Sequence, residues 1–350
     1  MTRTVVSPSP PPSLAGVLQE LRAAGLGRPA PLRVFGKFVG LVACALVVLA
    51  VVAHEAALTP LARAPLLALG CWLLASAAMC GHDGAHGAAS TRPWLNSLLA
   101  QAGFTLLGGL SVGYWRYKHN SLHHPRVNVA LEDPDVQQGL LALSARQHAA
   151  HGPFIRFLQR HFQAPVFWLV GAPLVMVDLK LTSLWFVARG LWTGERRRDQ
   201  LVDLAWLAAH YVFWLALPLV ALPWTTVLLL YAVTTVLPGI FLAAVFAPAH
   251  IPYPLVAESR DPLLLQLSST RNFRTNWFFR FTLIGLDHQV EHHVAPTLPH
   301  SQLARAARIV RAYCSRHGLP YHETSWARAL WDTTVSVREG WRTAEVVVAG

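Results

Sequence analysis

Three short clusters of histidine contain the residues whose types and spacing could bind a metal. They read HDGAH at 82–86, HNSLHH at 119–124 and DHQVEHH at 287–293, in a chain that carries 17 histidines. Histidines four residues apart, as in the first two clusters, share one face of a helix and can bind one ion together. Neutral imidazole suits Fe, Zn, Cu and Ni, so the ligand type alone does not choose the metal.

The elements that position these clusters belong to an integral membrane protein. Hydrophobic residues make up 53% of the 350 residues and charged residues only 13%, and the mean hydropathy is +0.37. The net charge of +11 comes from basic residues that lie in groups between long uncharged stretches. No nucleic-acid-binding motif accompanies this charge, so we expect no nucleic-acid partner.

Four uncharged stretches are long enough to cross a bilayer, which takes about 20 residues. Between Leu204 and Ala257 the chain has no charged residue, and Pro223 with Trp224 indicates a turn between two spans. We therefore predict an all-α membrane protein with four transmembrane helices in two hairpins, capped by a cytoplasmic helical domain that carries the histidine clusters. The membrane domain is predicted over 34–320, with spans at about 35–54, 62–81, 203–222 and 224–246.

The distribution of basic residues predicts the orientation. Of the 29 Lys and Arg residues, only Arg63 falls in the two short turns of the hairpins. The positive-inside rule then places both termini, the middle loop and the histidine clusters on the cytoplasmic side.

Two further apolar segments, 93–115 and 165–177, could be re-entrant, interfacial or spanning. If 93–115 crossed the membrane once, the first two histidine clusters would lie on opposite sides and could not meet. We therefore expect this segment to be bent, and its glycines, Gly108 and Gly109 among them, suit a bend.

The two ends of the chain are predicted to lie outside the membrane domain. Residues 1–33 should form a Pro-rich disordered tail followed by a short amphipathic helix from Leu14 to Leu21, either on the membrane surface or solvated. Residues 321–350 are predicted to be a C-terminal tail. Between them, the segment from Pro299 to Gly318 reads as a basic amphipathic helix that rests on the bilayer, receives a partner or docks on the protein itself. The four cysteines have no paired short spacing, which argues against disulfides or a Cys-type zinc site.

In this order and around these spans, HDGAH, HNSLHH and QVEHH resemble the three histidine boxes of the membrane fatty acid desaturase family. Asn128 with Asp133-Pro134-Asp135 resembles the segment that follows the second box, and Thr270-Arg271-Asn272 resembles the lead-in to the third. The resemblance covers about residues 35–320. Gln289, where many members have histidine, is similar to the form in front-end and related acyl-lipid desaturases, although we expect no fused cytochrome b5 domain in this chain.

The resemblance implies a di-iron centre. It implies two irons bound by a set of eight histidines: His82, His86, His119, His123, His124, His250, His292 and His293. His288 and Gln289 are further candidates for a ligand or for a residue that supports one. The nearest carboxylates, which could orient the histidine rings, are Asp83, Glu291, Asp133 and Asp135; for the last two, a cap or loop role is the alternative.

The chemistry implied is oxidation of an unactivated methylene, which needs an oxygen-activating cofactor because no proton there is acidic. O2 is then the co-substrate, and a membrane lipid or thioester-linked acyl chain is the substrate, held in a tunnel. Candidates for its wall are Trp72, Phe104, Trp115 and Phe241, and for each of them packing in the core or against lipid is the alternative. No haem, flavin or nucleotide motif is present, so electrons should come from an external donor, a ferredoxin or a cytochrome b5-type protein with its reductase.

Two alternatives stay open at this level. A hydroxylase, ketolase or acetylenase on the same scaffold, acting on a lipid, carotenoid or sphingoid base, would share every motif above. A membrane metal transporter would also carry histidines, but its ligands should line the spans near mid-bilayer, where only His210 lies. The oligomeric state is open.

Overall fold

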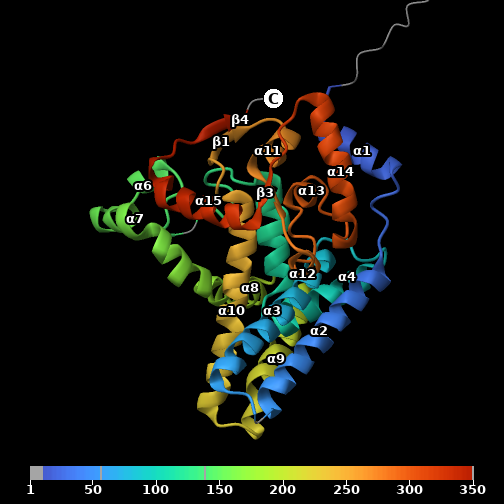
Figure 1. Cartoon of the computed structure of the whole chain (residues 1–350), viewed down its shortest axis with the longest axis vertical. Coiled ribbons are helices and arrows are strands. Elements are labelled where there is room, and N and C mark those ends of the chain that lie inside the picture. The colour runs from blue at the N-terminus through green and yellow to red at the C-terminus, as the bar shows by residue number, and fades with distance from the viewer. Residues whose placement is uncertain (1–10, 56, 138, 349–350) are drawn as a thin grey trace, which may run out of the picture.

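The computed structural model describes residues 11–55, 57–137 and 139–348, and it is mostly helical (Figure 1). In Figure 1 the long helices run toward the bottom, and most of the orange and red C-terminal segments lie in the upper half. The long helices are α2 (Pro31–His54), α3 (Pro60–Ala85), α8 (Ala172–Thr193), α9 (Arg197–Tyr211) and α10 (Trp224–His250).

Two hairpins carry most of the apolar length. Helix α2 packs along α3, and α9 continues through η5 (Val212–Ala216) and η6 (Pro218–Val220) before the chain turns into α10. Prolines at the first turns of α2 and α3 suit positions whose N–H has no helical partner. Large apolar side chains such as Val47, Leu61 and Leu229 are exposed on the outer faces, as expected of a surface that contacts lipid.

Within the described residues, five helical stretches are long and apolar enough to cross a membrane. Four of them correspond to the predicted spans, now bounded at Pro31–His54, Leu61–Ala85, Arg197–Val220 and Trp224–His250. The fifth, Pro153–Thr193, contains the ambiguous segment 165–177 and consists of α7 (Pro153–Val166), η4 (Phe167–Gly171) and α8. The protein is therefore mainly helical and has several apolar helices. The number of transmembrane spans, four, stays a prediction.

The segment 93–115 is bent. It contains α4 (Pro93–Ala100), the π-helix η1 (Gln101–Leu107) and α5 (Val112–Trp115). The chain direction bends by 108° between the helical parts Pro93–Leu107 and Val112–Arg126. The bend falls at Gly108 and Gly109, and Gly109 has φ +73°, a conformation that favours glycine. After the bend come the π-helix η2 (Arg116–His123) and η3 (His124–Arg126), so the chain returns to the end of the molecule where α3 finishes.

The residues after α10 form a cap over the ends of α3 and α10. It contains α11 (Pro262–Ser269), α12 (Trp277–Thr282), α13 (Gln289–Val294), α14 (His300–His317), α15 (Trp326–Glu339) and η7 (Gly340–Arg342). Four short strands qualify the all-α prediction: β1 (Val256–Ser259) pairs in parallel with β4 (Val346–Val348), and β2 (Asn272–Arg274) with β3 (Glu323–Ser325). One further short helix, α6 (Ala145–Ala149), precedes α7.

Both ends of the chain differ from the expected tails. Residues 1–10 of the expected disordered tail lie outside the described residues. Helix α1 (Leu14–Ala23) forms as predicted, but its apolar face is not on a membrane surface: Val17 and Leu21 are buried in a cluster with residues of α13 and α14. The prediction of a C-terminal tail at 321–350 is wrong for its described part, because α15 packs against α7 and α10. Gln163 donates to the carbonyl of Val337 across this contact.

Candidate metal centre

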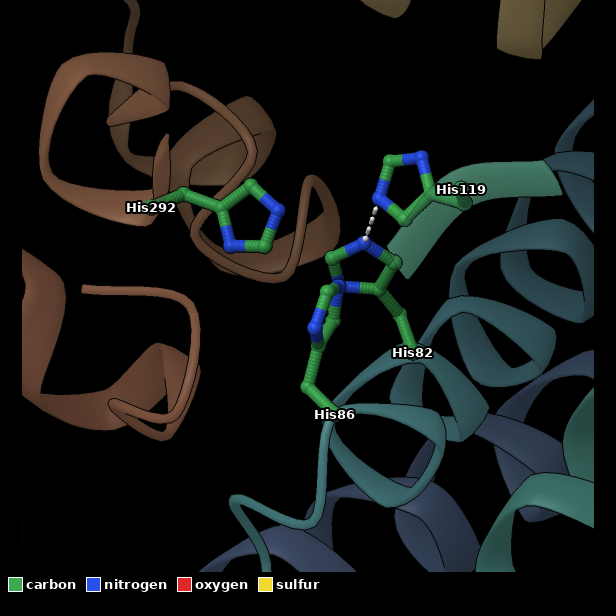
Figure 2. A group of neighbouring side chains, drawn as sticks. All are labelled: His82, His86, His119 and His292. Atoms are coloured by element: carbon green, nitrogen blue, oxygen red, sulfur yellow. Dashed lines mark hydrogen bonds between the residues drawn. The ribbon is translucent and has the colours of Figure 1, made fainter. Parts of the chain in front are cut away.

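Four histidines from three segments meet at the end of α3 (Figure 2). They are His82 and His86 at the end of α3, His119 on η2 and His292 on α13, and their nearest ring nitrogens all lie within 4.8 Å of one another. Nε2 of His82 is 3.0 Å from Nε2 of His119. Because the bent segment brings His119 back to the end of α3, one group contains histidines of all three clusters.

A second group contains His123, His250 and His293, again with ring nitrogens within 4.8 Å of one another. His123 lies on η2, His250 is the last residue of α10, and His293 follows His292 on α13. The wide turn of a π-helix puts residues four and five apart on one side, which lets η2 supply both groups. π-Helical turns occur frequently at functional sites.

His124 lies between the two groups. Its Nε2 is 3.1 Å from Nε2 of His119, and its ring centre is 4.4 Å from that of His293 and 4.8 Å from that of His86. All eight histidines named from the sequence are therefore together.

Hydrogen bonds fix the tautomer of the rings in the second group. Nδ1 of His250 is 3.1 Å from the carbonyl oxygen of Ser269, and Nδ1 of His293 is 3.0 Å from Oε1 of Gln266. Since both partners only accept, each Nδ1 carries the proton and each Nε2 keeps its lone pair. The Gln266 amide is itself oriented, because its Nε2 donates to the carbonyl of His124.

Asp133 fixes the tautomer of His123 in the same way. Both carboxylate oxygens lie 3.0 Å from Nδ1 of His123, and the carboxylate also accepts from the backbone N–H of Asn128 and Asp135. This arrangement combines the two roles considered for Asp133, a ring-orienting partner and a loop residue. Asp135 forms an ion pair with Lys118, and its Oδ2 is 3.4 Å from Nδ1 of His123.

The imidazoles fit a metal-binding role. Among the eight histidines brought together here, six buried ring nitrogens have no hydrogen-bond partner in the described part of the chain: Nε2 of His86, His123, His250, His292 and His293, and Nδ1 of His124. Leaving each of them unpaired would cost roughly 1–3 kcal/mol. Burial, followed by the neighbouring imidazoles, lowers the pKa of His292 and His293 well below the usual value, so both rings present neutral lone pairs. Nitrogens about 2.1 Å from one ion also lie about 3 Å apart when they are neighbours in its shell.

The other residues suggested by the sequence lie outside the two groups. His288 is half-buried, with Nδ1 and Nε2 each 3.8 Å from a carboxylate, of Glu291 and Asp287 respectively. Gln289 is fully buried and donates to the carbonyl of Leu286. Glu291 accepts from Asn272 and Tyr321 rather than from a histidine of either group.

Asp83 also has a different partner. Its carboxylate accepts from the backbone N–H and from Nδ1 of His300, the latter at 2.7 Å. The contact joins the end of α3 to the start of α14. Sequence reasoning did not single out His300, Gln266 or Ser269; none of them belongs to a histidine cluster, so their roles follow only from the packing of the cap.

An apolar pocket lies beside the first histidine group, between α3, η1, α8 and α10. Phe104 and Trp115 line it, and their rings lie 6.5 Å and 6.2 Å from the ring of His82. Its other lining residues include Ala75, Leu107 and Trp214. Of the four wall candidates, Trp72 and Phe241 are absent from this lining and instead pack on each other at 4.5 Å.

Comparison with known proteins places this arrangement in a family. A family model described as fatty acid desaturase matches residues 58–325. Human fatty acid desaturase 3 is 29% identical over 263 residues, which cover 74% of this chain and 57% of that protein. The acyl-lipid (9-3)-desaturase of Physcomitrium patens is 28% identical over 307 residues, 78% of this chain and 55% of that protein. The chain spans slightly more than half the length of these curated relatives.

Proposed function

Because this chain belongs to the fatty acid desaturase family, we propose that it is a membrane-bound desaturase that inserts a carbon–carbon double bond into a fatty acyl chain. The observation that carries the proposal is the pair of buried histidine groups whose unpaired ring nitrogens converge beside an apolar pocket. The acyl chain is lipid- or thioester-linked in this proposal.

The reaction balances with one O2. Two adjacent methylenes lose two hydrogen atoms, and these, with two protons and two electrons from outside, reduce O2 to two molecules of water. The electrons come from a protein donor of the ferredoxin or cytochrome b5 type.

The eight histidines are the proposed ligands of two iron ions. Bound iron would supply the oxygen activation that removes hydrogen from an unactivated methylene. The chain's own residues set the conditions: Asp133, Ser269 and Gln266 hold three of the rings with Nε2 facing inward. Ring orientation of this kind matters because loss of such a partner typically costs 10–100-fold in metal affinity or activity.

The apolar pocket is the proposed site of the acyl chain. Phe104 and Trp115 form its wall next to His82, so a chain lying along them would bring its methylenes near the first group. The lining is apolar, so a lipid-linked chain that comes from the bilayer stays in an apolar environment, whereas a thioester-linked chain that leaves water gains about 0.8 kcal/mol per methylene. The pocket therefore both binds the substrate and sets which carbons meet the histidines.

The test is the fatty acid composition of cells that express the chain together with a compatible electron donor. We expect an additional unsaturated species with the wild type and with His161→Ala, an exposed histidine far from both groups in sequence. We expect no such species with His123→Ala, which removes one proposed ligand. Gas chromatography with mass spectrometry identifies the product and the double-bond position. Equal product from His123→Ala and wild type, or a hydroxylated product instead of an alkene, would contradict the proposal.

We also propose that the histidine groups and both termini face the cytoplasm, because Arg63 alone among the 29 basic residues lies at the far turns. In a Cys44→Ser background, a cysteine introduced by Ala57→Cys at the far turn should react with an impermeant maleimide in intact cells. One introduced by Ser315→Cys on α14 should react only after lysis. The reverse pattern would show the opposite orientation.

A further inference from the structure

A cavity separate from the apolar pocket lies at the start of the first apolar helix. Helices α2, α12 and α14 surround it, together with the loop that precedes α13, and its volume is about 400 Å³. Its lining includes Arg33, Lys37, Arg280, Asp287 and His288.

The lining is predominantly cationic. Arg33, Lys37 and Arg280 contribute three positive charges, whereas Asp287 is the only carboxylate among the lining residues. Oδ2 of Asp287 lies 3.8 Å from Nε2 of His288, which also lines the cavity. A net positive cavity of this size attracts an anionic group.

The cavity lies where a membrane surface would be. Arg33 and Lys37 are in the first two turns of α2, the first of the candidate spans. On α12, Trp277 is 80% exposed and Phe281 is 52% exposed, and large aromatic side chains are typical of the interface between lipid and water. The Lys37 ammonium lies 4.6 Å from the centre of the Phe281 ring, so the charged and aromatic parts of this surface are in contact.

A groove leads from the charged residues along the helix. Gly36 and Gly40 share the face of α2 that carries Arg33 and Lys37, and they line the cavity. A Cβ added at either glycine would meet nothing within 4 Å. The site therefore has a cationic end at the start of the span and an open, uncharged end one to two turns further along it.

Unpaired polar groups complete the charged end. Both ring nitrogens of His288 and Oγ of Ser301 are buried and have no hydrogen-bond partner among the described residues. His300, in contrast, is held by Asp83, and it forms the wall toward the histidine groups. The cavity thus offers cations and free hydrogen-bonding groups to an anion that does not enter the metal centre.

We propose that this cavity binds the phosphate ester of a membrane phospholipid, with the glycerol and the start of an acyl chain lying along Gly36 and Gly40. Arg33, Lys37 and Arg280 pair with the phosphate oxygens. The site is independent of the oxidation proposed above, because none of its lining residues belongs to either histidine group.

The test is lipid binding by the purified full chain in a neutral detergent, measured by native mass spectrometry. Dioleoyl phosphatidylglycerol is the probe, and the matching diacylglycerol, which lacks phosphate, is the reference. We expect at least tenfold preference for phosphatidylglycerol in the wild type and in the control Arg308→Gln, which removes an exposed charge on α14. The double variant Arg33→Gln/Lys37→Gln and the single variant Arg280→Gln should lose most of this preference.

Two further arms separate the alternatives. Gly40→Leu fills the groove without changing charge and should weaken phosphatidylglycerol binding, so the proposal stays testable even if the double variant does not fold. Coenzyme A is a soluble phosphate ester and should not displace phosphatidylglycerol. If it did, the cavity would be a site for a soluble acyl carrier, and the assignment to a membrane lipid would be overturned. Equal preference for phosphatidylglycerol in the wild type and in all three charge and groove variants would overturn the proposal altogether.

Discussion

A histidine ring binds a metal well only when its other nitrogen is already committed, and three chemically different groups do this here. A carboxylate holds His123, a backbone carbonyl holds His250 and a side-chain amide holds His293. The partners differ in charge, so their loss should have different consequences. A neutral acceptor fixes only the tautomer, whereas the Asp133 carboxylate also makes His123 a stronger electron donor.

Replacing Asp133 by Asn should therefore lower the metal content of the purified protein. The amide keeps the shape but removes the negative charge and half of the accepting capacity at Nδ1 of His123. We expect metal to be lost at chelator concentrations 10–100-fold lower than for the wild type, measured as the metal-to-protein ratio by mass spectrometry.

The neighbouring Glu132 provides the control. It is exposed and pairs with Arg126, so Glu132→Gln changes the same chemistry one residue away without touching a histidine. Identical chelator sensitivity of Asp133→Asn and Glu132→Gln would show that the carboxylate does not support the metal centre.

At this scale the sequence predicted the histidines but not all of their partners. Spacing alone brought out the three clusters, because four-residue repeats of one residue type are visible in a linear chain. The contacts of Gln266 and Ser269 depend on how α11 packs against α10 and α13, and no local pattern reports that packing. Arg271 belongs to the segment Thr270-Arg271-Asn272, which resembles the lead-in to the third histidine box. The structure gives it a structural role, because it donates to the carbonyls of Pro248 and Ala329 and so joins α10 to α15.

At the scale of elements, one buried carboxylate holds the bent segment against α9. Asp203 is 3% exposed and accepts from the side chains of Gln101 and Ser111 and from the backbone N–H of Gly113. These three donors lie on both sides of the bend. Asp203 therefore ties the two arms of the segment together, and the second arm carries His119.

Asp203→Ala should lower thermal stability and metal content together. Each hydrogen bond to a charged group contributes roughly 1.5–3 kcal/mol, and the substitution leaves three donors without an acceptor. We expect the variant to unfold in detergent at a temperature several degrees below that of the wild type. Differential scanning fluorimetry measures the unfolding temperature, and metal analysis is done on the same samples. The exposed Asp199 on the same helix serves for comparison, and a drop of similar size in Asp199→Ala would rule out the specific role of Asp203.

The elements were predicted unevenly from the sequence. The lengths of the uncharged stretches and the position of Pro223 predicted the two helical hairpins. The requirement that the first two histidine clusters lie on the same side predicted the bend in the segment 93–115. The short strands were missed because three or four residues are too few to show an alternating pattern. The helix from 326 to 339 was missed because its polar and apolar residues serve contacts with α7 and α10, which are distant in the chain.

For the whole molecule, the apolar pocket and the histidine groups should be separable by mutation. Ala75 on α3 lines the pocket and is 7% exposed, so Ala75→Phe should fill space that an acyl chain would occupy. We expect more than a tenfold loss of unsaturated product, or a shift to shorter acyl chains, while the metal content stays at the wild-type level. Product analysis and metal analysis of the same preparations measure both quantities.

The matched variant is Ala68→Phe, which adds the same side chain to an exposed position of α3. It should leave both product and metal unchanged. If Ala75→Phe made as much product of the same chain length as Ala68→Phe, the acyl chain would have to bind elsewhere.

Hydropathy was sufficient to predict a membrane protein, but not to settle how many helices cross. The stretch from Pro153 to Thr193 meets the same criterion of length and apolarity as the four predicted spans, although it carries Lys180 and Asp178. Lys180 is buried and donates to Tyr231 and Thr235 on α10. These hydrogen bonds let a lysine be buried between helices, whereas a hydropathy calculation on the sequence counts the same lysine as a charge against a membrane span.

The dispersal of the histidines along the chain has a consequence for biosynthesis. His82 and His86 leave the ribosome well before His292 and His293, and α1 finds its partner helix α14 only when the C-terminal part has been made. In the nascent chain, both helical hairpins are therefore complete while each histidine group still lacks a residue. A metal that needs every histidine of a group would bind only after α13 has been made, so a product that ends before α13 should contain less metal than the full chain.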